Sequence, residues 1–113
     1  MASVFVKSLR TIKSDITGEE KEYRVNNAVF TFLEADYKLS QAQWAKGLEE
    51  NETLYGAYFV TSVMKANGLK VSYKEVLENT TMADISKYIM VYQTEMFRLE
   101  DKENEEVNEE EGE

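Results

Sequence analysis

Carboxylates, hydroxyls and lysine amines are the groups in this sequence that could do chemistry, because it contains no Cys and no His. That composition excludes disulfides, thiolate or imidazole metal ligands, His-dependent catalytic triads and Cys nucleophiles. Glu34 and Asp36 are two residues apart, a spacing at which helical side chains do not face each other. Glu49, Glu50 and Glu52 could hold a divalent cation. No Asp-x-Asp-x-Asp-Gly loop accompanies them, so a solvated helix end is the favoured interpretation.

The glycines give no sign of a nucleotide site either. They are scattered along the chain and form no Gly-x-Gly or Gly-Lys-Ser/Thr cluster that could hold a phosphate. We therefore predict a protein that is not an enzyme, with no catalytic residue, no metal and no cofactor.

Aromatic and methionine side chains are better candidates for a functional surface. The chain has seven Tyr and one Trp, residue types enriched at protein interfaces because they combine a large apolar area with a polar group. Four tyrosines lie on apolar helical stripes and are expected in the core: Tyr55, Tyr58, Tyr88 and Tyr92. The residues predicted to bind a partner are aromatics at helix ends or on short helices and two adaptable methionines: Tyr37, Trp44, Tyr73, Met82 and Met90.

The charge of the chain is concentrated at its C-terminal end. The formal net charge is −9, and residues 100–113 contain nine acidic residues and one Lys, which leaves 12 − 13 = −1 for residues 1–99. A near-neutral body argues against a nucleic-acid surface, despite Lys7, Arg10 and Lys13 near the start. Without an apolar run of membrane-spanning length or a signal-peptide core, we expect a cytoplasmic protein with no membrane partner.

Hydrophobic periodicity predicts a mainly α fold with a short N-terminal β-hairpin, an α+β class dominated by about five helices. Residues 3–9 and 22–25 read as the two strands, with Gly18 in the turn between them. Asn26 or Asn27 can cap a first helix, and Ser40 with Gln43 has capping-box spacing for a second.

The second half of the chain continues the helical pattern. Residues 51–67 carry a wide apolar stripe that predicts a central helix ended by Gly68. Ser72 can cap a short helix with Val76 and Leu77 facing inward, and Thr81 can cap a last helix that ends near Leu99. We therefore predict one helical domain over residues 1–99 and a disordered acidic tail over residues 100–113.

Residues 20–99 resemble the tail assembly chaperones of long-tailed phages and prophages of Gram-positive bacteria. The resemblance is carried by a short β segment, then "FTFLEAD", "LYGAYFV" and "KANGLKVSYKEVLEN", and then by a final aromatic helix with an acidic end. It implies a protein that binds the long tape measure protein, promotes polymerisation of tail tube protein around it, and is absent from the mature tail.

Two other readings stay open beside this one. Net charge alone would also suit an acidic DNA mimic or a small helical regulator that acts by binding protein or nucleic acid. The sequence also leaves open whether the chain forms a homo-oligomer.

Overall fold

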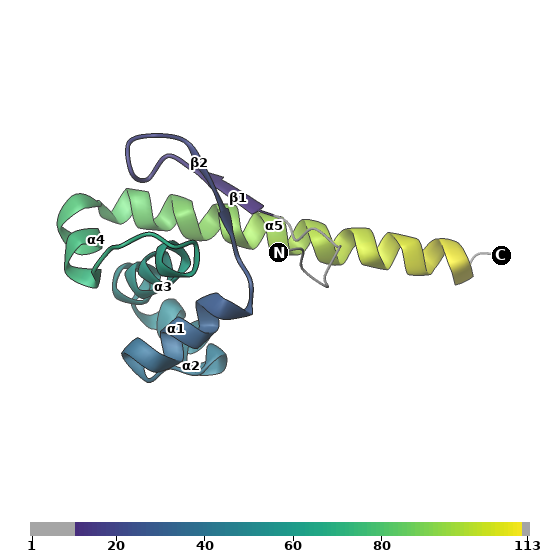
Figure 1. Cartoon of the computed structure of the whole chain (residues 1–113). Coiled ribbons are helices and arrows are strands. Elements are labelled where there is room, and N and C mark those ends of the chain that lie inside the picture. The colour runs from purple at the N-terminus through teal and green to yellow at the C-terminus, as the bar shows by residue number, and fades with distance from the viewer. Residues whose placement is uncertain (1–10, 112–113) are drawn as a thin grey trace, which may run out of the picture.

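The computed structural model describes the backbone of residues 11–111 and the side chains of residues 11–96. Within that range the predicted helix-dominated α+β fold is confirmed, with five helices and a two-stranded hairpin (Figure 1). The elements in chain order are β1 (Thr11–Ser14), β2 (Lys21–Arg24), α1 (Asn27–Tyr37), α2 (Gln41–Glu50), α3 (Glu52–Ala66), α4 (Tyr73–Asn79) and α5 (Met82–Glu111).

β1 and β2 form an antiparallel hairpin in which Ile12 pairs with Tyr23. Both of these side chains are buried, so this side of the hairpin faces the helices. Gly18 has a φ of 99° in the connecting turn, as predicted, and this left-handed conformation favours a residue without Cβ. The first predicted strand, residues 3–9, lies outside the described residues, and β2 pairs with Thr11–Ser14.

Asn67 fastens the hairpin to the C-terminal end of α3. Its side-chain Oδ1 accepts a hydrogen bond from the Arg24 backbone N–H at 2.9 Å, and its Nδ2 donates to the Arg24 carbonyl at 2.9 Å. These two bonds satisfy backbone groups of β2 that the hairpin leaves unpaired. The hairpin also contacts α5 through β1, so it bridges α3 and α5.

Side-chain caps begin the helices where the sequence predicts. Asn26 accepts from the Ala28 N–H at the start of α1 (3.1 Å), and Ser72 accepts from the Glu75 N–H at the start of α4 (3.1 Å). At α2 the capping box is complete, since the Ser40 hydroxyl and the Gln43 amide each accept from the other residue's backbone N–H. Each cap satisfies backbone donors that the first turn of a helix leaves free.

α3 is the central helix of the fold. It contacts α1, α2, α4, α5 and β2, and Gly56, Ala57 and residues 59–64 are all buried. Gly68 ends the helix region in a left-handed conformation with a φ of 84°, as predicted, and the Leu69 N–H donates to the Met64 carbonyl. This position in the middle of the bundle explains why its apolar stripe is wide.

α5 runs along one side of the bundle and continues beyond it (Figure 1). Thr81 and Asp84 begin it with reciprocal side-chain-to-backbone hydrogen bonds of 2.9 and 3.2 Å. The sequence predicts that this helix ends near Leu99, whereas its backbone is helical through Glu111. The physical reason is that Glu, Lys and Arg favour helix and that no Gly or Pro occurs between Met82 and Glu111. The predicted disorder of the acidic tail stays a prediction.

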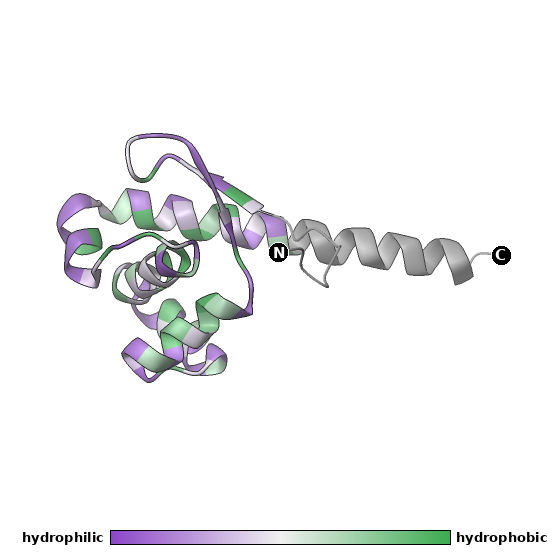
Figure 2. Cartoon of the chain, in the orientation of Figure 1, coloured by the Kyte–Doolittle hydropathy of each residue, from purple (hydrophilic) through white to green (hydrophobic). Residues whose placement is uncertain are grey.

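The core lies between α3 and the elements around it. Figure 2 shows hydrophobic and hydrophilic residues interspersed along the first part of α5. Ile85, Tyr88 and Ile89 place the inner side of α5 against this core. Val76 of α4 is buried as predicted, but the prediction that Leu77 faces inward is wrong, because 40% of it is exposed. In a helix of two turns, neighbouring residues point in directions about 100° apart, so only one of the pair can face the core.

Candidate functional site

Tyr37, Tyr58 and Tyr73 form a tyrosine cluster where α1, α3 and α4 meet. The Tyr58 ring stacks on Tyr37 with centroids 4.2 Å apart and on Tyr73 with centroids 4.7 Å apart. Tyr55 meets the edge of the cluster, with its ring at 90° to that of Tyr58. The structure therefore brings together two predicted partner-binding residues, Tyr37 and Tyr73, through Tyr58, which the sequence assigned to the core.

Burial sets the electrostatics of the tyrosine cluster. It raises the pKa of Tyr73 to about 12, and the nearby phenol of Tyr58 adds to the increase. Burial also raises the pKa of Tyr37, against the lowering effect of the Lys65 ammonium. Lys65 is itself held by Asp36 at 2.8 Å. Because their pKa values are raised, Tyr37 and Tyr73 are neutral at physiological pH. Both side chains are half-buried, and their aromatic faces help to join the three helices.

Trp44 is a core residue. Only 4% of it is exposed, its ring stacks on Phe59 at 4.9 Å, and its indole N–H donates to the Tyr55 carbonyl at 2.9 Å. The edges of Phe30 and Tyr92 also face it. In this conformation Trp44 has no surface to offer a partner, although the sequence predicts that it binds one. It lies on a helix of mixed polarity, where local pattern does not reveal how deeply a large ring is covered.

The methionine strip, defined here as Met82, Ser86, Met90 and Gln93, lies on the outer side of α5. Their spacing of four, four and three residues places them on one side of a helix. All four are exposed, with Met82 73% and Met90 59% exposed. Met82 and Met90 therefore both lie outside the core.

The methionine strip contains no charged residue. Within the described side chains of α5, the charges are Asp84, Lys87 and Glu95. Helical geometry places Asp84 and Glu95 on other sides of the helix, whereas Lys87 borders the strip, three residues before Met90. Asp84 caps the helix, and Lys87 pairs with Asp15 of the hairpin turn at 3.3 Å. Two exposed methionines on an uncharged helix side are suited to receive an apolar segment, because the thioether side chain is flexible and polarizable.

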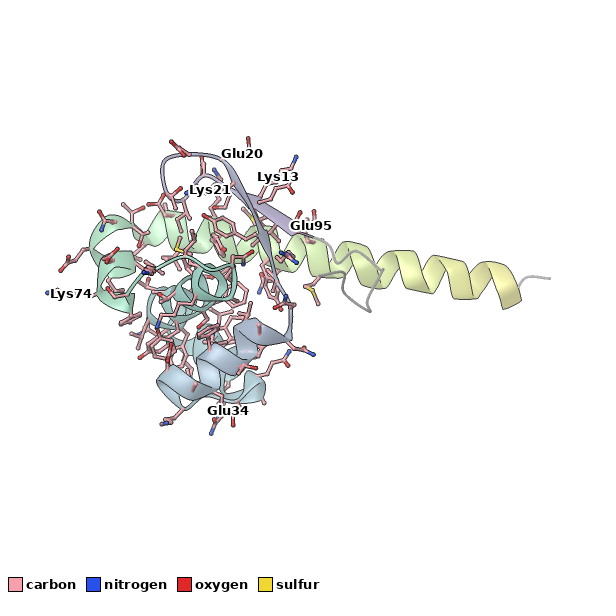
Figure 3. The ribbon with its side chains drawn as sticks, viewed as in Figure 1. Lys13, Glu20, Lys21, Glu34, Lys74 and Glu95 are labelled. Atoms are coloured by element: carbon pink, nitrogen blue, oxygen red, sulfur yellow. The ribbon has the colours of Figure 1, made fainter. Side chains whose placement is uncertain are left out.

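Charged side chains occupy other parts of the surface. Figure 3 shows Lys13, Glu20 and Lys21 extending outward around the hairpin, Lys74 outward from α4, and Glu34 outward from α1. Among the described side chains, no group of three or more acidic residues could hold a metal ion. None of the described helices has a segment long and apolar enough to cross a membrane.

The buried Tyr88 carries a hydroxyl group that makes no hydrogen bond. Tyr23 of β2 and Tyr88 of α5 meet edge to face with ring centroids 6.0 Å apart, and both hydroxyl oxygens are shielded from solvent. Burial raises the pKa of Tyr88 strongly, and the adjacent Tyr23 adds to the increase. A buried hydroxyl without a partner costs stability, because it loses its hydrogen bonds to water.

Replacing Tyr88 by Phe is therefore expected to raise the free energy of unfolding by about 1 kcal/mol at pH 7. Urea titration followed by circular dichroism measures the change. A matched control is Thr61→Val, because the buried Thr61 hydroxyl donates to the Ala57 carbonyl at 2.8 Å. That variant removes a hydrogen bond that is made, so it should lower stability. A loss of stability in Tyr88→Phe would contradict the conclusion that the Tyr88 hydroxyl makes no hydrogen bond.

Buried tyrosines also determine how the stability of the fold changes at high pH. Burial raises the pKa of Tyr23, Tyr37, Tyr73, Tyr88 and Tyr92 above the ordinary value of 10.0. The unfolded chain then releases phenol protons at lower pH than the folded chain. Stability is thus retained below pH 10 and falls as the pH rises above it, by up to about 1.4 kcal/mol per pH unit for each tyrosine. Tyr88→Phe should make that fall less steep.

The five predicted partner-binding residues thus separate into three places. Tyr37 and Tyr73 join helices in the tyrosine cluster, Trp44 is buried, and Met82 and Met90 are exposed on α5. Sequence reasoning missed Ser86 and Gln93: a helical wheel places them beside Met82 and Met90, but only the packing around α5 shows that this side is exposed. Comparison with known proteins gives no relative on which to test this site: no protein-family model, curated protein or solved structure matches the chain.

Proposed function

We propose that this chain is a tail assembly chaperone of a long-tailed phage or prophage. It binds the tape measure protein, promotes polymerisation of tail tube protein around it, and is absent from the mature tail. It acts in the cytoplasm of the host cell as a binding protein and not as an enzyme. The observation that carries the proposal is the methionine strip, an exposed and uncharged side of α5.

The chemistry of the strip supports a helical client. An amphipathic helix buries its apolar side when it lies against an exposed apolar surface, and methionine adapts to clients of different shape. A tape measure protein offers many such helices in sequence. The resemblance of residues 20–99 to tail assembly chaperones supplies the class of client, and the acidic end of the chain would keep a crowded complex soluble.

The primary test is co-expression with a tape measure protein taken from the same genome. We expect the tape measure protein to become soluble and to co-purify with this chain, because the chaperone covers its apolar helix faces. A tape measure protein that stays insoluble and unbound in the presence of this chain would refute the proposal.

Replacing Met82 and Met90 together by Glu is expected to weaken tape measure binding at least tenfold, which corresponds to about 1.4 kcal/mol. The reason is that two carboxylates must lose water to be covered by an apolar client. Thermal unfolding should change little, since both methionines are exposed. Binding is measured by titration calorimetry with a soluble tape measure fragment.

The matched control adds the same charge on another part of the surface. Ala35→Glu with Ala42→Glu places two carboxylates at exposed positions of α1 and α2, on helices other than the one that carries the strip. This variant should bind as the unmodified chain does. Equal weakening in both variants would indicate a general effect of charge and would remove the strip from the binding surface.

A further inference from the structure

The structure places two surfaces of different chemistry in line on one helix. The first part of α5 carries the methionine strip over residues 82–93, and its continuation over residues 100–111 has eight acidic residues and one Lys, so 1 − 8 = −7. Figure 1 shows that this continuation extends past the other helices. The strip is therefore followed along the same axis by a strongly negative segment.

The length of α5 separates the two surfaces. Their centres are near residues 88 and 106, and at 1.5 Å per residue they lie about 27 Å apart. Electrostatic attraction between exposed groups in physiological salt decays over about 8 Å. A short peptide on the strip would not experience the acidic segment, whereas a helix of about 20 residues or more could contact both.

We infer that the segment this chain binds is a long amphipathic helix with an apolar side that covers the methionine strip and a Lys/Arg-rich end that lies beside residues 100–111. This inference rests on the proposed function and specifies the client segment. Complementary charge at one end would fix the position of the client helix along α5, while the apolar contact supplies the burial.

Charge also disfavours binding of a second copy of this chain along α5. A parallel second copy would place −7 beside −7, and repulsion between like charges would oppose that pairing. An antiparallel copy could cover the strip but would leave both acidic segments without counter-charge. A basic helical client satisfies both surfaces at once.

The test uses the full chain and synthetic helices of about 30 residues, the length of α5 over which the two surfaces extend. Every peptide has the same amphipathic half with a leucine side, followed or preceded by a block of Lys or by a block of Glu. Both orders are made, because the client could run parallel or antiparallel to α5. Dissociation constants are measured by fluorescence anisotropy at low and at physiological salt.

Two full-length variants locate the charge effect. The first neutralises the acidic segment with Glu105→Gln, Glu106→Gln, Glu109→Gln, Glu110→Gln and Glu111→Gln. The matched control removes the same number of charges from exposed positions elsewhere, with Glu19→Gln, Glu20→Gln, Glu34→Gln, Glu49→Gln and Glu50→Gln.

We expect one order of the Lys-block peptide to bind at least tenfold more tightly than its Glu-block counterpart. That preference should disappear in the first variant, persist in the control, and weaken with salt. Met82→Glu with Met90→Glu should weaken binding of every peptide. Equal affinity for Lys-block and Glu-block peptides, absence of binding by all of them, or equal loss in both neutralised variants would overturn the inference.

These outcomes are distinct from failure of the proposed function. If the tape measure protein co-purifies and the Met82 and Met90 substitutions release it, but the peptides show no charge preference, the chaperone function stands and only the basic end of the client is refuted. If the tape measure protein is not bound but the Lys-block peptide is, the client class is wrong and the docking surface stands.

Discussion

Replacing Gly56 by Val is expected to lower the free energy of unfolding by about 3 kcal/mol, near the upper end for overpacking a core. A Cβ atom at Gly56 would collide with Cγ2 of Ile85, where α3 packs against α5. Ile85 is buried and branched at Cβ, so this methyl group cannot move without shifting the backbone. Thermal or urea unfolding followed by circular dichroism measures the loss.

Two further variants identify the cause of that loss. Ile85→Ala alone should cost about 2–5 kcal/mol through the cavity that it leaves. Combined with Gly56→Val, it should cost at least about 1 kcal/mol less than the sum of the two single changes, because the new side chain fills the cavity. Strict additivity would show that the Gly56 and Ile85 positions do not compete for space.

Gly47 supplies a second comparison. A Cβ there would meet the ring of Tyr55, which is half-buried and can turn toward solvent, so Gly47→Val should cost less than Gly56→Val. The sequence alone suggests only that a glycine inside a helix costs about 1 kcal/mol relative to Ala. The packing of Tyr55 explains why a larger residue is absent.

Replacing Trp44 by Ala is expected to cost about 3–5 kcal/mol of folding free energy. The ring is buried between Phe59 and the edges of Phe30 and Tyr92, and its removal leaves a large cavity and removes the hydrogen bond that the Tyr55 carbonyl accepts from the indole. Trp44→Phe, which keeps an aromatic ring but loses the indole donor, should cost less. Urea titration compares the two variants.

Fluorescence gives an independent check on the position of Trp44. It is the only tryptophan of the chain, so emission reports on this residue alone. In the folded protein we expect emission at short wavelength and poor quenching by iodide, and both should change together on unfolding. A client that binds the methionine strip should leave the emission unchanged. Strong iodide quenching in the folded protein would show that Trp44 is exposed, as its predicted role in partner binding requires.

Local chemistry made much of this fold predictable. A cap depends on a side chain and a backbone N–H two or three residues away, so Asn26, Ser40 and Ser72 could be identified without knowledge of the fold. The left-handed residue Gly68 follows from the same short-range rules. The end of the last helix was harder, because acidic composition suggested disorder while helix propensity favoured continuation through Glu111.

The sequence by itself determined the helix-dominated class, the hairpin turn, the helix starts and the separation of charge from the rest of the chain. Only the tertiary structure decided which aromatic residues are covered and which side of α5 is free. Trp44 and Met82 are both predicted to bind a partner, yet Trp44 is buried and Met82 is exposed, since burial depends on the elements that pack against a residue. Because those contacts join residues far apart in the chain, the methionine strip is recognised only when the helices around α5 are in place.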